Sequence, residues 1–137
     1  MVAGSGPDKR GIAVTDKRPV NLDLGSISLP ITAIASITHR LTGVFLVAGV
    51  ALLLWMLDAS LASQESFNAM KEVASSFIFK LVLWAVLAGL IYHMAAGVKH
   101  LIMDLGYGET LEGGIAGAKT VFAVSAILIV LVGAWIW

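Results

Sequence analysis

Three long runs of apolar residues dominate the chain. The first extends from Pro30 to Leu57 and is interrupted only by His39 and Arg40; the second covers Leu81 to Val98, and the third covers Thr120 to Trp137. Each is close to or longer than the roughly 18–20 apolar residues that a helix needs to cross hydrocarbon. No run alternates with the period of two that a membrane strand shows. The pattern predicts an all-α membrane protein with three transmembrane helices.

We expect the spans at about residues 30–57, 80–103 and 119–137, which form one membrane domain (30–137) after an N-terminal arm (1–29). The glycine-rich segment Asp104 to Gly117 follows no strand, so it predicts a turn and not a phosphate-binding loop. Apolar residues in segment 66–77 are spaced for one helical face and indicate a short helix on the outer membrane surface, with an ordinary loop as the alternative. These residues are Phe67, Met70, Val73 and Phe77.

Composition supports the bilayer as the solvent of this chain. Hydrophobic residues make up 58% of the sequence and charged residues 13%, with a mean hydropathy of +0.92. A soluble globule carries about 25% charged residues, which it needs to cover its surface. The chain has no cysteine, which excludes disulfides and cysteine-ligated zinc or iron–sulfur sites within it. Its net charge of zero gives no field that would attract nucleic acid.

The basic residues predict an orientation. Six of them lie in the N-terminal arm or the second connection, against two in the first connection, which places the N-terminus on the cytoplasmic side and the C-terminus on the periplasmic side. Residues 1–29 contain neither the apolar run of a signal peptide nor the arginine-rich pattern of a mitochondrial transit peptide. We therefore expect a bacterial inner membrane. The six are Lys9, Arg10, Lys17, Arg18, Lys99 and Lys119, and the two are Lys71 and Lys80.

Small and polar residues form one stripe on each of the first two spans, because positions three and four apart share a helical face. Ionisable groups in hydrocarbon cost several kcal/mol, so these stripes have to face something other than lipid. Counted from the cytoplasmic ends of their spans, Arg40 and His93 lie at matching depths of roughly 15 Å. The stripes consist of Thr32, Ser36, His39, Arg40 and Gly43, and of Gly89, His93, Ala96, Gly97, His100 and Asp104.

Simpler explanations exist for individual residues. Arg40 can extend toward the cytoplasmic headgroups. His93 can be a packed histidine bonded to a backbone carbonyl or a serine, and His100 can be an interfacial residue. His93, however, shares a face with two glycines and with His100. That combination favours a ligand role for His93.

A deep, neutral imidazole flanked by glycines suits an axial ligand of haem iron. Arginine and histidine side chains nearby can pair with the haem propionates. His39 or His100 can pair with a propionate or can be the second axial ligand. That second ligand can also come from another subunit. Ser36 and Arg40 suit a quinone, because a hydroxyl and a guanidinium stabilise the charge that quinone oxygens gain on reduction.

Three motifs carry a resemblance to a known family. RPVNLDL (Arg18–Leu24), PITAIASITHRLTG (Pro30–Gly43) and YHMAAGVKHLIMDLG (Tyr92–Gly106) resemble the cytochrome b membrane-anchor subunit of bacterial succinate dehydrogenase. The similarity runs from about Arg18 to the C-terminus and includes the three-span layout.

The resemblance implies an anchor subunit of succinate:ubiquinone oxidoreductase. A second three-helix anchor would complete the helical bundle, share one haem b and supply the other axial ligand. His93 matches the axial ligand; His39, Arg40 and His100 match positions near the propionates, and Ser36 and Arg40 match the ubiquinone pocket. FAD and iron–sulfur clusters would belong to a flavoprotein subunit and an iron–sulfur subunit. Gly97 would leave room for the haem.

One position departs from the family pattern, and three rival functions stay open. Lys99 stands where relatives commonly have arginine, and lysine lacks the planar fork for a bidentate contact. The same architecture also serves a quinol:fumarate reductase. A self-contained transmembrane cytochrome would need four histidines for two haems, and the chain has three. A cofactor-free anchor or assembly protein is the remaining alternative.

Overall fold

The computed structural model of the protein describes residues 29–137, which form helices joined by short connections. Within this range there is no strand, and the prediction of an all-α protein is confirmed. Three helices are long and apolar enough to cross a membrane, as predicted, and one is short. The N-terminal arm and its basic residues lie outside the described range. The helices are α1 (Ile31–Ala62), α2 (Gln64–Ser75), α3 (Phe77–Asp104) and α4 (Leu111–Ile136).

The long helices exceed the apolar runs that predict them. Helix α1 has 32 residues and is therefore about 48 Å long, whereas the hydrocarbon core is about 30 Å thick. It continues past Leu57 through Asp58 to Ala62, so its last turns carry a charge. Such a helix crosses the bilayer with a tilt or extends beyond it. The expected positions of the membrane boundaries stay predictions.

The first connection forms a helix, α2, and not an ordinary loop. It begins with a reciprocal cap, in which the Ser63 hydroxyl accepts from the Ser66 N–H and the Ser66 hydroxyl accepts from the Ser63 N–H, both at 3.0 Å. Phe67 and Val73 are exposed. This apolar face is free to meet a membrane surface, and that placement stays a prediction.

The turn between α3 and α4 is shorter than the glycine content predicts. It covers residues 105–110 and contains Gly106 and Gly108 with φ of 88° and 74°, a left-handed conformation that favours glycine. The expected turn from Asp104 to Gly117 is wrong in its second half, where α4 begins at Leu111. The Thr110 hydroxyl caps α4 by accepting from the Gly113 N–H at 3.1 Å.

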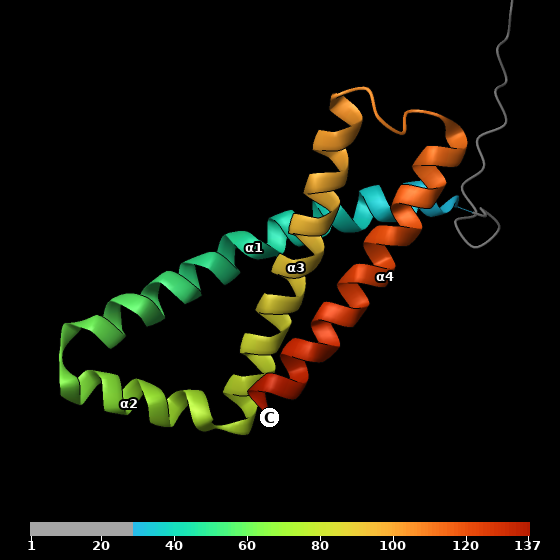
Figure 1. Cartoon of the computed structure of the whole chain (residues 1–137). Helices are drawn as coiled ribbons and strands as arrows, with labels where there is room; N and C mark the ends of the chain where they lie inside the picture. The colour runs from blue at the N-terminus through green and yellow to red at the C-terminus, as the bar shows by residue number, and fades with distance from the viewer. Residues whose placement is uncertain (1–28) are drawn as a thin grey trace, which may run out of the picture.

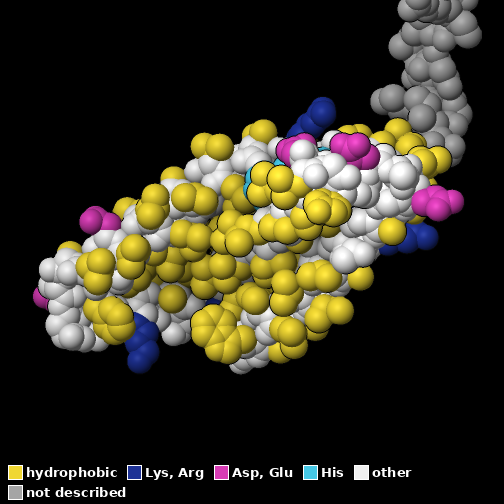
Figure 2. Space-filling view, turned by 45° about the horizontal axis from the view of Figure 1, so that its top comes forward, with side chains coloured by type: hydrophobic (Ala, Val, Ile, Leu, Met, Phe, Trp, Pro, Cys, Tyr) yellow, Lys and Arg dark blue, Asp and Glu magenta, His cyan; other side chains and the backbone are white. Residues whose placement is uncertain are grey.

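Helices α3 and α4 run antiparallel and lie side by side (Figure 1). The first half of α1 crosses this pair at a steep angle. The second half of α1 diverges, and α2 returns the chain to the start of α3. On the face shown in Figure 2, hydrophobic side chains cover most of the length and charged side chains lie toward the ends. This distribution fits a protein whose middle is surrounded by hydrocarbon.

Small side chains form much of the buried interior. Where the solvent is lipid, helices associate through close packing and not through the hydrophobic effect, and small residues allow that approach. Few side chains are therefore buried within the isolated chain. The buried hydrophobic residues are Ala35, Leu46, Val86, Tyr92, Ala96, Ala118 and Val121.

A tryptophan joins α3 to α4 near the C-terminus. The Trp84 indole N–H donates a hydrogen bond to the Ile129 carbonyl at 3.0 Å. The indole approaches α4 at Gly133, where an added Cβ would lie 3.0 Å from Trp84 Nε1. The glycine is therefore required for this contact.

Replacement of Gly133 by leucine is expected to lower the free energy of unfolding by about 1–3 kcal/mol, because the new side chain would displace the indole. Denaturant titration of the purified protein in detergent measures the change. Ala134→Leu is the matched control, since Ala134 is exposed on the same helix. Equal stability of the two variants would contradict the role given to the Trp84–Gly133 contact.

Candidate functional site

All three histidines of the chain meet where α1 crosses α3. The rings of His39 and His93 are stacked with their centroids 4.2 Å apart, and the centroid of His100 lies 5.1 Å from that of His39. His39 comes from α1 and the other two from α3. The two stripes therefore meet at these residues.

Glycines on both helices make this close crossing possible. An added Cβ at Gly43 of α1 would lie 3.0 Å from Cε1 of His93, and one at Gly89 of α3 would lie 3.0 Å from the Phe45 ring. Each helix thus receives a ring from the other at a position without a side chain. Larger residues at these positions would separate the helices.

Tyr92 fixes the crossing one residue away from the histidine face. Its hydroxyl donates to the Ala35 carbonyl of α1 at 3.0 Å, and the side chain is buried. The sequence indicates only a packing or interface aromatic at this position. The hydrogen bond that it makes across the helices is not visible in the residue pattern.

The Nδ1 atom of His93 has two neighbours on α1. It lies 3.1 Å from the His39 carbonyl oxygen and 3.2 Å from the Thr42 hydroxyl oxygen. The Thr42 hydroxyl is itself 2.9 Å from the carbonyl oxygens of Thr38 and His39. Thr42 is absent from the predicted site residues. Its place three residues after His39 nevertheless puts it on the same face of α1 as that histidine.

The donors and acceptors assign the tautomer of His93. The His39 carbonyl oxygen only accepts, so its contact with Nδ1 requires a proton on that nitrogen, and the Thr42 hydroxyl oxygen then meets the same N–H as an acceptor. Both neighbours of Nδ1 are then acceptors, and Nδ1 carries the proton. In the neutral ring the lone pair is left on Nε2.

This tautomer of His93 is compatible with both interpretations that the sequence leaves as alternatives, a packed histidine and a metal ligand. His93 is bonded to a backbone carbonyl, as a packed histidine would be. The same bond leaves Nε2 as the nitrogen for a metal, and metal-ligating histidines usually donate their other N–H in this way. His93 is half-buried, so its ring is not enclosed by this chain.

His39 has a polar atom without a partner. Its Nε2 is buried and makes no hydrogen bond within residues 29–137. The nearest small neighbour is Gly97, where an added Cβ would lie 3.8 Å away. An unsatisfied buried polar group costs about 1–3 kcal/mol, so this atom suits a bond to a group outside the chain.

The remaining predicted residues lie around this cluster. His100 and Ser36 are half-buried, and Arg40 is exposed. Ser36 and Arg40 are one turn apart on the same face of α1. A joint role of these two residues stays a prediction.

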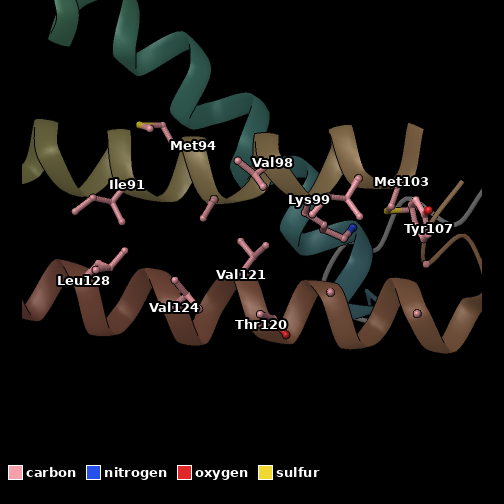
Figure 3. A pocket seen from close by; sticks show the side chains of 15 residues that line it. Ile91, Met94, Val98, Lys99, Met103, Tyr107, Thr120, Val121, Val124 and Leu128 are labelled. Carbon is pink, nitrogen blue, oxygen red and sulfur yellow. The ribbon is translucent and has the colours of Figure 1, made fainter. Parts of the chain in front are cut away.

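A groove of the described chain lies away from the histidines. A groove of about 600 Å³ lies between α3 and α4, and Lys99 is the one charged side chain in its lining (Figure 3). At 100° per residue, Val98 and Ile102 of its lining lie roughly 140–180° around α3 from His93. The groove therefore opens on the opposite side of α3 from the candidate site.

The donor set fits a haem site that this chain only partly supplies. Among residues 29–137, no group of three or more histidine, aspartate or glutamate side chains is arranged to hold a metal ion. One free imidazole nitrogen is what a shared haem requires from this chain. The buried His39 Nε2 suits a propionate. Gly97, which carries no side chain, lies next to this atom.

Comparison with known proteins gives a consistent result. The family model described as "Succinate dehydrogenase/Fumarate reductase transmembrane subunit" matches residues 14–132. The chain is 43% identical over 122 residues to the succinate dehydrogenase cytochrome b556 subunit of Coxiella burnetii, covering 88% of this chain and 98% of the relative. It is 37% identical over 114 residues to the same subunit of Paracoccus denitrificans, covering 83% and 88%.

Proposed function

This chain belongs to the family of succinate dehydrogenase and fumarate reductase transmembrane subunits, and we propose that it binds haem b and forms part of a ubiquinone site. Family membership confirms the resemblance of the three motifs and makes the chain a membrane-anchor subunit of this enzyme complex. Succinate oxidation belongs to the complex, not to this subunit alone.

The observation that carries the haem proposal is the free Nε2 of His93. Its Nδ1–H bonds to the His39 carbonyl, so the neutral ring presents a lone pair without further rearrangement. The relatives are named as cytochrome b556 subunits. When bound between two imidazoles, haem iron exchanges one electron at a time and has no free position for oxygen.

Other residues of the cluster would hold the periphery of the haem. The unpaired Nε2 of His39 would bond a propionate, and Arg40 and His100 would add positive charge or further donors there. Gly97 would leave space for the porphyrin face. The second axial ligand would come from a partner anchor, since His39 is stacked against His93 itself.

The proposed ubiquinone site lies beside the haem site on α1. The Ser36 hydroxyl would hydrogen-bond one quinone oxygen, and the Arg40 guanidinium would stabilise the negative charge that these oxygens gain on reduction. The exposure of Arg40 supports this proposal, because a lipid-borne quinone would reach it without passing through the helix bundle.

The proposed complex contains a second three-helix anchor, an iron–sulfur subunit with its clusters and a flavoprotein with FAD. The proposed location is a bacterial inner membrane, with the N-terminus in the cytoplasm and Trp137 on the periplasmic side. The three apolar helices support the membrane placement. The orientation rests on the distribution of lysine and arginine alone.

The rival functions differ in how well they fit the histidine cluster. A transmembrane cytochrome with haems in both leaflets would need histidines at two depths, but all three rings lie together at one crossing. The family description includes both succinate dehydrogenase and fumarate reductase, so family membership is compatible with either direction of the reaction. The physiological direction depends on the cofactor potentials in the whole complex. A cofactor-free anchor is an outcome of the first test below.

Replacement of His93 by alanine is expected to abolish the low-spin haem spectrum of the purified complex, because it removes the imidazole nitrogen that would ligate the iron. Absorption spectra and haem-to-protein ratios measure this. Met94→Ala is the matched control, since Met94 is the next residue and faces the groove (Figure 3). A haem spectrum unchanged in the His93 variant, or absent from the unsubstituted complex, would contradict the haem proposal.

Ser36→Ala and Arg40→Ala are each expected to lower ubiquinone reduction at least about tenfold, because each removes a group that would stabilise charge on the quinone. Succinate oxidation by a water-soluble dye should be unchanged, since it bypasses the membrane subunits. Lys71→Ala removes a cation from α2, away from the site, and controls for general charge effects. Equal losses in both assays would indicate damage to assembly and would contradict a quinone site here.

A further inference from the structure

We propose that Thr42 is a positioning residue for the haem ligand, whose hydroxyl oxygen holds the ring of His93 in the orientation that leaves Nε2 available to the iron. The proposal rests on the proposed haem ligation by His93 and extends it. Its basis is the contact between the Thr42 hydroxyl oxygen and His93 Nδ1 at 3.2 Å, across 51 residues of sequence.

The local bonds of Thr42 alone do not explain this contact. A threonine inside a helix commonly donates its hydroxyl proton to a carbonyl three or four residues earlier. Thr42 does this toward Thr38 and His39, both at 2.9 Å. Thr120 on α4 does the same toward Ala116 at 3.0 Å. Among the hydroxyls of residues 29–137, that of Thr42 alone also contacts an imidazole of another helix.

The His39 carbonyl sets the tautomer of His93, and Thr42 adds a second acceptor to the same N–H. The carbonyl oxygen lies 3.1 Å from Nδ1 and only accepts, so Nδ1 carries the proton. The Thr42 hydroxyl oxygen then meets this N–H with a lone pair, because its own proton is donated to a helix carbonyl. Thr42 therefore supplies a second fixed point that orients the ring in the tautomer that the carbonyl selects.

The surrounding contacts also hold the ring of His93 in a fixed position. The His39 ring covers one face of His93 at a centroid distance of 4.2 Å. The backbone of α1 approaches the edge of His93 at Gly43. Rotation of the imidazole about its terminal torsion is soft in a free side chain, so the two acceptors supply the direction that packing alone does not. An acceptor on Nδ1–H also raises the basicity of the ligating nitrogen.

The test uses the whole complex with Thr42→Val, which keeps the shape of the side chain and removes the oxygen. We expect haem to dissociate about tenfold faster, at the low end of the 10–100-fold effect of such supporting groups, because the His39 carbonyl still accepts from Nδ1. The haem midpoint potential should shift in the positive direction, since a less basic ligand stabilises the oxidised iron less.

Two further variants separate this role from a structural one. Thr42→Ser keeps the hydroxyl and should restore both the dissociation rate and the potential. Thr120→Val removes the corresponding bond on α4 and should change neither. If Thr42→Val does not assemble, Thr42→Ala removes the same oxygen without adding a methyl group in its place and provides the same comparison.

The outcomes distinguish failure of this proposal from failure of haem ligation. A normal dissociation rate and potential in Thr42→Val, or a serine variant as altered as the valine variant, would overturn the role of Thr42. If haem is lost in His93→Ala but Thr42→Val is normal, ligation stands and positioning by Thr42 fails. If His93→Ala keeps its haem spectrum, the ligation itself is wrong.

Discussion

Polar groups inside hydrocarbon must bond to the protein, because no water is available there. At the crossing of α1 and α3 this requirement is met by the Nδ1–H of His93, which bonds to the His39 carbonyl at 3.1 Å. The bond ties one helix to the backbone of the other and also determines which imidazole nitrogen is free. Stability of the crossing and availability of the proposed haem ligand thus depend on the same interaction.

The bond in turn depends on how closely the helices approach. Gly43 and Gly89 allow rings of the opposite helix to reach the backbone, and Tyr92 adds a second link to the Ala35 carbonyl. The pairing of α3 with α4 uses a similar device, in which Trp84 reaches a carbonyl beside a glycine. At Gly43 and Gly133 a small residue admits a large ring of the neighbouring helix, and a backbone carbonyl accepts a hydrogen bond from that ring.

Helix α3 presents two faces of different composition. The histidines lie on one face, and the groove with Lys99 lies on the other. A partner that completes the proposed haem site would approach from the histidine side, together with the exposed Arg40. The apolar residues in the second half of α1, among them Leu54, Trp55 and Leu61, are exposed in the isolated chain and leave further surface for lipid or a partner.

The sequence by itself determined the three long helices and the two polar stripes, because helical periodicity is a local property of the backbone. It left a helix or a loop as alternatives for the segment between the first two spans. The turn after Asp104 is shorter than its glycines predict, because Gly114 and Gly117 lie within α4 and pack against Thr32 and Lys99. Only the tertiary structure decided that Thr42 and the His39 carbonyl face His93. Those partners lie 51 and 54 residues away in sequence, and their meeting depends on the rotation and crossing of two helices, which no local pattern specifies.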